Sequence, residues 1–284
     1  MGTQWENFLQ NLGEWEGSFT RLSPTGTVLE DTPTRLSLEG LDENQRVRFT
    51  LQFFAPGANR ETDQPVRELV QDYQSLGRHI LFFDSGAFSQ ASMQLSPVST
   101  LLIEFGFIWG NRRLRAVHQF AVGGEAERFT LVREKRVGAG ARENPPLTLE
   151  QLLGRWEGEA QTLFPDLRNP ETFKTTLEVQ RTGTEGVEQR ITLASGNHRP
   201  HEIRSKGRVE GSMLEFEGGA RPVRVLMLPD GASLTFPHRV EVGQMFFLEA
   251  GWLIEPNLRQ RLMGSYNQRG EWTSVTLVTE RKVG

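Results

Sequence analysis

One motif occurs twice in this chain, and the repeat limits the possible folds more than any other feature. The segment GEWEGSFTRL begins at Gly13 and GRWEGEAQTL begins at Gly154, so Gly-x-Trp-Glu-Gly is written twice, each time after a short apolar run. Two later segments match at nearly the same spacing, FTLVREKR from Phe129 and VTLVTERK from Val275. Self-similarity at a fixed spacing indicates a duplicated module. Each half of the 284 residues, about 140, has the ordinary size of a domain.

The boundary between the copies is predicted from composition. The stretch VGAGARENPP, residues 137–146, supplies Gly, Ala and paired Pro but no face that a core would bury. We therefore predict an N-terminal domain at residues 1–138, a linker at 139–147 and a C-terminal domain at 148–284.

The hydrophobic spacing within each half changes from helical to extended. RVRFTLQFF alternates apolar and polar residues, which is typical of a strand with one wet face. Turn signals such as SPTG and PDG separate further runs of this kind. The prediction is an all-β chain of two tandem antiparallel up-and-down β-barrels, because closure removes the sheet edges. A short helix precedes each barrel, with apolar residues at helical spacing: Trp5, Phe8, Leu9 and Leu12, then Leu149, Leu152, Leu153 and Trp156.

Composition excludes several functional classes. The chain has no cysteine, which removes disulfides, thiolate metal sites and a cysteine nucleophile, and favours a reducing compartment. The net charge is -4, so no positive field is available for nucleic acid. We find no targeting segment and no apolar stretch near the ~20 residues of a membrane helix. A cytoplasmic protein without a transmembrane segment is expected.

The repeated motif resembles the calycin superfamily, the lipocalin-like barrels. In that superfamily a Gly-x-Trp motif opens the first strand, and a basic residue of the last strand lies across the tryptophan. Gly13 with Trp15, and Gly154 with Trp156, match this opening. The resemblance implies that the closing cation is Arg133 or Lys135 in the first copy and Arg281 in the second. Such a pair is worth ~0.5–2 kcal/mol.

The tandem arrangement is similar to an uncharacterised cyanobacterial family of two calycin-like domains. The helix, Gly-x-Trp and strand of residues 5–21 resemble those of phycobiliprotein chromophore lyases, and residues 154–165 are similar to haem-binding barrels that begin Gly-x-Trp-x-Gly. These resemblances imply bilin or haem as possible non-covalent cofactors.

Charged residues recur in the two copies. Glu104 and Arg115 match Glu249 and Arg261, and in each copy the glutamate and arginine lie on consecutive predicted strands. An inward guanidinium is able to hold a ligand carboxylate bidentately. The alternative, which repetition in both copies favours, is a structural ion-pair network or a solvated surface pair.

Three further side chains are candidates for a ligand site. Trp109 and Trp252 either pack in a core or line a cavity. His118 is a haem ligand only if its strand face is interior, and Gly264 stands at the matching position of the second copy. His198 and His201 have metal-ligand spacing but lie in a Pro- and Gly-containing segment, so no metal is predicted.

No nucleophile elbow, phosphate loop or dinucleotide fingerprint is present in the sequence. We therefore predict a non-catalytic binding protein for a small apolar or amphipathic ligand of the tetrapyrrole, carotenoid or lipid class. One alternative is a bilin lyase-like carrier that acts on phycobiliproteins. The other is a protein-interaction scaffold with filled barrels.

Overall fold

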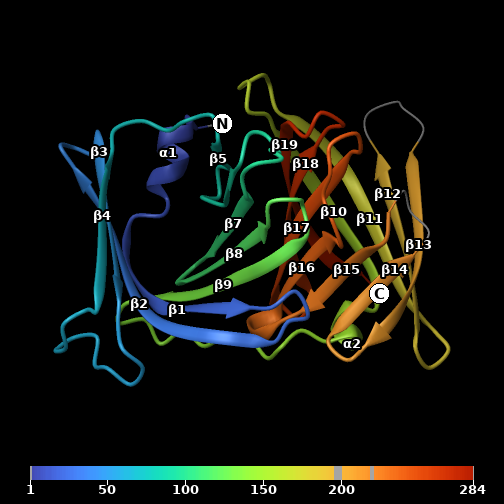
Figure 1. Ribbon diagram of the computed structural model, residues 1–284, viewed down its shortest axis with the longest axis horizontal. Helices are drawn as coiled ribbons and strands as arrows, with labels where there is room; N and C mark the ends of the chain where they lie inside the picture. The colour runs from blue at the N-terminus through green and yellow to red at the C-terminus, as the bar shows by residue number, and fades with distance from the viewer. Residues whose placement is uncertain (1, 195–199, 218–220, 284) are drawn as a thin grey trace. The chain divides into compact units, whose positions relative to one another are not determined.

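The computed structural model describes residues 2–194, 200–217 and 221–283, and these form two antiparallel β-sheets with short helices (Figure 1). The prediction of an all-β chain in two tandem antiparallel domains is confirmed; the second sheet closes into the predicted barrel, whereas the first stays open as a curled half-barrel. Neither described helix is long and apolar enough to cross a membrane. By proximity the residues group into two compact units: Met1–Gln90, Glu104–Val117 and Arg128–Glu143 form one, and Ala91–Ile103, His118–Glu127 and Asn144–Gly284 form the other.

The first sheet is a curled half-barrel. Its nine strands have the order β4-β3-β2-β1-β9-β8-β7-β6-β5, so β4 and β5 are its edges. The helix α1 (Gln4–Leu9) precedes it, and its strands are β1 (Gly13–Leu22), β2 (Val28–Leu41), β3 (Arg46–Phe53), β4 (Arg67–Tyr73), β5 (Ile80–Phe82), β6 (Phe88–Ala91), β7 (Leu101–Trp109), β8 (Arg112–Phe120) and β9 (Ala126–Arg136). β5 and β6 are short and β4 is exposed along most of its length, features that are typical of sheet edges.

The second sheet closes into a ten-stranded barrel because its first strand pairs with its last. The helix α2 (Leu149–Leu152) precedes β10 (Gly154–Leu163), β11 (Glu171–Thr182), β12 (Gly186–Ala194), β13 (His201–Glu210), β14 (Met213–Glu217), β15 (Val223–Met227), the 3-10 turn η1 (Pro229–Gly231), β16 (Ala232–Pro237), β17 (Phe246–Glu255), β18 (Leu258–Tyr266) and β19 (Trp272–Val283). The predicted linker at residues 139–147 runs between β9 and α2, and the domain bounds themselves stay a prediction.

Each repeated tryptophan anchors a core. Trp15 and Trp156 are fully buried, and each indole N–H donates to the backbone of the preceding helix or its end, Trp15 to Asn11 O at 3.1 Å and Trp156 to Leu152 O at 2.9 Å. Leu36, Leu38 and Val47 pack with Trp15, while Leu177, Val179 and Val187 pack with Trp156. The apolar face of each short helix therefore covers one end of its sheet.

The two glycines of the motif have separate physical reasons. Gly13 and Gly154 have φ of +125° and +109°, a region that side chains rarely adopt. Gly17 lies opposite Glu134 in the register and Gly158 opposite Glu280, where a Cβ would meet the neighbouring backbone. The motif thus permits a tight entry into the strand, a buried indole and a close approach of the last strand.

The cation over each indole differs from the one expected. Arg136 lies 4.4 Å from the Trp15 ring centroid, and Lys282 Nζ lies 5.3 Å from that of Trp156. The register explains this, because Trp15 pairs with Arg136 and Trp156 with Lys282, and directly paired residues share a face. The expected residues, Arg133, Lys135 and Arg281, fall at alternate positions and face the other side of the sheet.

Candidate functional site: buried arginine–glutamate networks and two cavities

A buried ion-pair network lies on the inner face of the half-barrel. Arg115 of β8 donates from Nε and Nη2 to both carboxylate oxygens of Glu134 at 3.2 and 3.0 Å, and from Nη1 to Glu104 at 2.9 Å. Arg113, two residues earlier on the same face, brings Nε to 3.6 Å from Glu134 Oε2. Glu104 and Arg115, which recur in the second copy, thus form an ion pair, and Glu134 is the additional partner.

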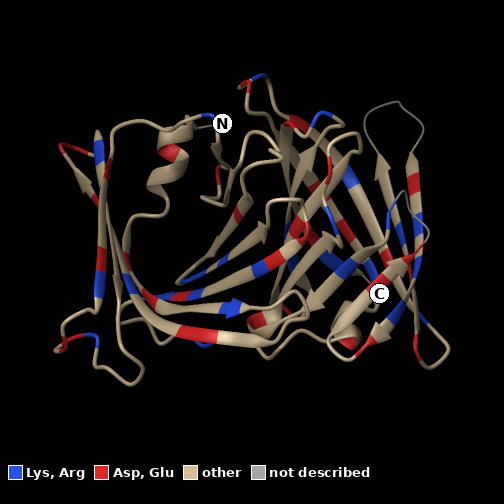
Figure 2. Ribbon diagram, in the orientation of Figure 1, with Lys and Arg blue, Asp and Glu red and all other residues tan. Residues whose placement is uncertain are grey.

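The barrel repeats this geometry. Arg261 of β18 donates from Nε and Nη2 to Glu280 at 3.0 and 3.1 Å, and from Nη1 to Glu249 at 3.0 Å. Arg259 donates from Nη1 to Glu280 at 3.5 Å and from Nη2 to Ser233 at 3.4 Å. Charges of both signs also alternate along the strands elsewhere, as Figure 2 shows.

Burial and ion pairing act against each other on the titratable groups. Burial lowers the pKa of Arg113 to about 10, although Glu134 opposes the effect. Burial also lowers the pKa of Arg115, but the charges of Glu134 and Glu104 outweigh it and hold that pKa above its ordinary value. For Glu134, burial raises the pKa, yet Arg115 and Arg113 bring it below its usual range. Arg113, Arg115 and Glu134 are therefore all charged at neutral pH.

The barrel contains a cavity of about 430 Å³ beside its network. Its lining is mainly apolar, and Arg261, Glu249 and the hydroxyl of Thr175 supply polar groups. Thr175 is buried, and its Oγ1 has no hydrogen-bond partner within the described residues. The core around Trp156 also lies in the barrel, and it shares Phe216 with the cavity lining. The apolar lining residues are Phe173, Ile191, Leu193, Ile203, Phe216, Val223, Pro237, Met245, Phe246, Phe247, Met263 and Val278.

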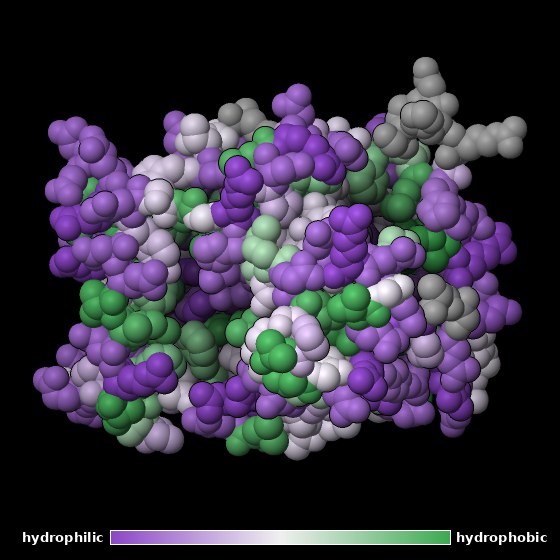
Figure 3. Space-filling model, turned by 45° about the horizontal axis from the view of Figure 1, so that its top comes forward, coloured by the Kyte–Doolittle hydropathy of each residue, from purple (hydrophilic) through white to green (hydrophobic). Residues whose placement is uncertain are grey.

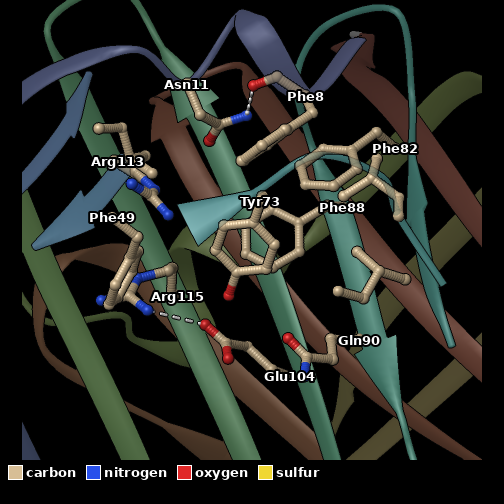
Figure 4. A pocket seen from close by; sticks show the side chains of 13 residues that line it. Phe8, Asn11, Phe49, Tyr73, Phe82, Phe88, Gln90, Glu104, Arg113 and Arg115 are labelled. Carbon is tan, nitrogen blue, oxygen red and sulfur yellow. Dashed lines mark hydrogen bonds and ion pairs between the residues drawn. The ribbon is translucent and has the colours of Figure 1, made fainter. Parts of the chain in front are cut away.

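The half-barrel contains a smaller cavity, of about 130 Å³, beside the corresponding network (Figure 4). Aromatic rings supply much of its lining, and the polar groups belong to Asn11, Gln90, Glu104, Arg113, Arg115 and the hydroxyl of Tyr73. In Figure 4, Asn11 and Arg113 lie at one end, while Glu104 and Gln90 lie at the other.

The predicted site residues divide into two groups. Glu104 and Arg115 line the small cavity, and Glu249 and Arg261 line the large one. The two arginines are fully engaged by glutamates, so the free guanidinium that we considered for a ligand carboxylate is found at neither position. Of the alternatives left open, the internal ion-pair network is the one observed.

Trp109, His118 and Trp252 line neither described cavity. For His118 the reason is strand alternation, because the cavity-lining residues Arg113 and Arg115 lie at alternate positions of β8. Trp109 is 41% exposed, whereas Trp252 is buried and its indole N–H donates to Asp230 O at 3.1 Å.

His118 is fully buried, and burial lowers its pKa to about 3. Its ring is therefore neutral at physiological pH, on the strand face opposite Arg115. A haem ligand at His118 requires this strand face to line a cavity. Neither described cavity is lined by His118, so this histidine is not a haem ligand in either of them. His198 lies outside the described residues, and within them no three potential metal ligands cluster.

Sequence reasoning missed Glu134, Glu280 and Arg113 as interior groups. Glu134 and Glu280 occupy matching positions of the repeat. This match indicates an ion pair, because a glutamate retained in both copies together with an arginine favours pairing between them. Asn11 had no such signal, because Leu152 stands at its place in the second copy.

The two halves match two family models. Residues 1–139 match the N-terminal model of the domain of unknown function DUF3598, and residues 143–283 match the C-terminal domain of biogenesis factor required for ATP synthase 1. No curated protein matches.

A solved structure is similar over the full chain. It is a protein of unknown function from the DUF3598 family of Nostoc punctiforme, 44% identical, with a TM-score of 0.90 and all of both chains covered. An S-type phycobiliprotein lyase from Guillardia theta is 13% identical, with a TM-score of 0.40 over 48% of this chain and 90% of its own.

Proposed function

The chain belongs to the DUF3598 family, and for this member we propose a binding function in which the C-terminal barrel holds a small, mainly apolar ligand. The cavity of about 430 Å³ carries the proposal. Its size lies within the ~300–1,000 Å³ of small-molecule sites, and such sites combine an apolar lining with a few placed polar groups.

The polar groups of the cavity favour one ligand class among lipids, carotenoids and tetrapyrroles. Every nitrogen of Arg261 already donates to Glu249 or Glu280, so an acidic ligand group would have to displace a buried carboxylate. The hydroxyl of Thr175 has no partner within the described residues and is available to a ligand hydroxyl or carbonyl. The described lining contains no histidine for a haem iron. We therefore favour a lipid-like molecule with a neutral hydrogen-bonding group inside the barrel.

Met245 supports an entrance near the β16–β17 turn. Its side chain is 67% exposed and still contributes to the cavity lining. An apolar ligand that enters there would leave a charged head group, where it has one, in solvent. On the face drawn in Figure 3, hydrophobic residues form small separate patches among hydrophilic ones, so no broad apolar docking surface competes in that view.

The test is a titration of the purified full chain with cis-parinaric acid, whose polyene fluoresces when buried. We expect saturable 1:1 binding at micromolar Kd. Leu193→Trp, which fills the cavity from β12, should weaken binding at least tenfold, because the bulky ring occupies the ligand's volume. The control Thr192→Trp lies at the alternate position of the same strand and should leave Kd unchanged.

Two results decide against this function. One is a lack of saturable binding, and the other is an equal loss in both tryptophan variants. Parallel titrations with biliverdin and haem test the tetrapyrrole class; tighter biliverdin binding, lost in Leu193→Trp, would favour the bilin-carrier alternative over a lipid.

A second candidate is a role in assembling a protein complex through the C-terminal half. The match of residues 143–283 to the ATP synthase biogenesis-factor domain favours it. Binding to purified ATP synthase subunits, unchanged by Leu193→Trp, is the expected result. The cavity of the barrel favours ligand binding over the filled barrel of our scaffold alternative.

A further inference from the structure

The small cavity of the half-barrel has the dimensions and lining of a site for a single aromatic ring. Its volume is about 130 Å³, close to the ~150 Å³ of an engineered apolar cavity that binds benzene. Phe8, Phe82 and Phe88 form a tilted series with centroids 5.2 and 5.0 Å apart, and Phe49 and Tyr73 also contribute (Figure 4). These rings leave room for a planar group between them and the polar end.

Arg113 presents unused donors to this cavity. It is 4% exposed, yet its Nε and Nη1 make no hydrogen bond within the described residues. The approach of Nε to Glu134, at 3.6 Å, is an ion pair but too long for a hydrogen bond. The guanidinium lies 5.8 Å from the Trp15 ring centroid and 5.9 Å from that of Phe88, so aromatic faces replace hydrogen-bond acceptors around it. A buried donor without an acceptor is costly and rare.

Asn11 presents the complementary acceptor. It is 1% exposed, and its Nδ2 donates to Gly86 O at 2.9 Å and to Phe8 O at 3.4 Å. Those two bonds fix the orientation of the amide and leave Oδ1 as its only polar atom without a partner, since Oδ1 accepts no hydrogen bond within the described residues. A buried donor and a buried acceptor therefore line the same end of an aromatic cavity (Figure 4).

The second copy shows that the fold does not require this polar pair. Leu152 takes the place of Asn11, since Trp156 donates to its backbone as Trp15 does to that of Asn11. Arg259 takes the place of Arg113, but its Nη1 and Nη2 are bonded to Glu280 and Ser233. The same core motif is thus built without an unused amide oxygen, and with an arginine whose terminal nitrogens are both bonded; only its Nε, like that of Arg113, makes no hydrogen bond within the described residues.

We propose that this cavity is a second binding site, for a single-ring planar molecule with a carbonyl and an N–H on adjacent atoms, as in a lactam or ureide. The carbonyl oxygen accepts from Arg113 Nη1, and the N–H donates to Asn11 Oδ1. A carboxylate fits less well because it offers no proton to Asn11 and would share the cavity with Glu104. The inference is independent of the ligand proposed for the barrel.

The experiment is an NMR titration of the full chain with 2-pyridone, a planar lactam, observed at the indole N–H of Trp15. This reporter donates to the backbone of Asn11 and lies beside Arg113. 4-Pyridone has the same atoms with its N–H and carbonyl on opposite sides of the ring, and benzoate tests an anion. We expect 2-pyridone to bind at least tenfold more tightly than either.

Two variants test the named contacts. Asn11→Leu and Arg113→Met should each weaken 2-pyridone binding at least tenfold, whereas Arg48→Met, on an exposed part of β3, should not change it. Asn11→Leu introduces the residue that the second copy has at this position, so this variant is expected to fold. It therefore still tests the proposal if Arg113→Met fails to fold. Leu193→Trp should leave 2-pyridone binding unchanged, which separates this site from the barrel.

Several outcomes would overturn the inference. Tighter binding of benzoate would make the cavity an anion site. Equal affinities for the two pyridones, or unchanged affinity in Asn11→Leu, would reduce it to an apolar cavity. Undetectable 2-pyridone binding at millimolar concentration would remove the site altogether.

Discussion

The half-barrel and the barrel contain the same buried network, but they complete its surroundings differently. In both, one arginine is held by two glutamates and a second lies two residues earlier. In the barrel, Ser233 bonds that second arginine, while in the half-barrel the ring of Phe88 lies beside it. The comparison indicates that the duplicated arginine–glutamate network has a structural role. The residues packed beside the network determine whether one of its polar groups remains available to a ligand.

The networks themselves should give the largest effects on stability. Glu134→Leu and Glu280→Leu each leave two buried arginines without their shared carboxylate, and removal of one partner of a buried pair costs ~3–5 kcal/mol. Because the geometries match, we expect similar losses in both halves, measured as the free energy of unfolding in urea by tryptophan fluorescence.

Glu134→Gln and Glu280→Gln retain the shape and provide the milder pair. A loss below about 1 kcal/mol in either leucine variant, or a large difference between the halves, would contradict a shared structural role.

Substitution of the second glycine of the motif should destabilise the two halves to different extents, with losses smaller than those of the glutamate variants. An added Cβ at Gly17 would lie 1.9 Å from Arg133 O, whereas at Gly158 it would lie 2.6 Å from Thr279 O. Overpacking of this kind costs ~1–3 kcal/mol, so we expect Gly17→Ala to destabilise more than Gly158→Ala in thermal unfolding. Gly140→Ala, with open space around it, is the control. The opposite order would show that the strand spacing differs from that described.

His118 should give the half-barrel an acid sensitivity that the barrel lacks, because Gly264 takes its place there. Folding holds its pKa at about 3, below the ordinary 6.5, so between these values the unfolded chain binds a proton that the folded chain does not. Stability is therefore lost as pH falls from 6.5, by about 1.4 kcal/mol per pH unit. Urea unfolding at a series of pH values measures the slope.

His118→Gln should reduce this slope, and the exposed His79→Gln should retain it. If both variants keep the wild-type slope, the acid sensitivity arises from other groups, such as Glu134. Because folding lowers the pKa of Glu134 from its ordinary 4.5, this glutamate makes the protein lose stability as the pH falls below 4.5.

Much of the architecture was predictable because it depends on local spacing. The repeat and the alternation of apolar residues predicted a helix and an antiparallel sheet in each half, and the repeated Glu104, Arg115, Glu249 and Arg261 indicated paired charges. Spacing along one strand fixes which of its residues share a face. That information is present in the sequence itself.

Other features depended on pairing between distant strands. Arg136 and Lys282 cover the indoles, instead of Arg133, Lys135 or Arg281, because register assigns the residue opposite each tryptophan. The tertiary structure also decided which face of β8 lines a cavity, and His118 lies on the other face. A shift of one residue reverses every side chain of a strand, so a sequence pattern that leaves the register open also leaves the site open.

By itself, the sequence determined a duplicated all-β chain in which each Gly-x-Trp-Glu-Gly motif begins a sheet around a buried indole. Only the tertiary structure decided that one sheet closes and the other stays open, that Glu134 and Glu280 hold the arginines, and that Asn11 and Arg113 meet at one cavity. The reason is physical: closure and ion pairing join residues from strands far apart in the chain, and their geometry exists only after the strands have paired.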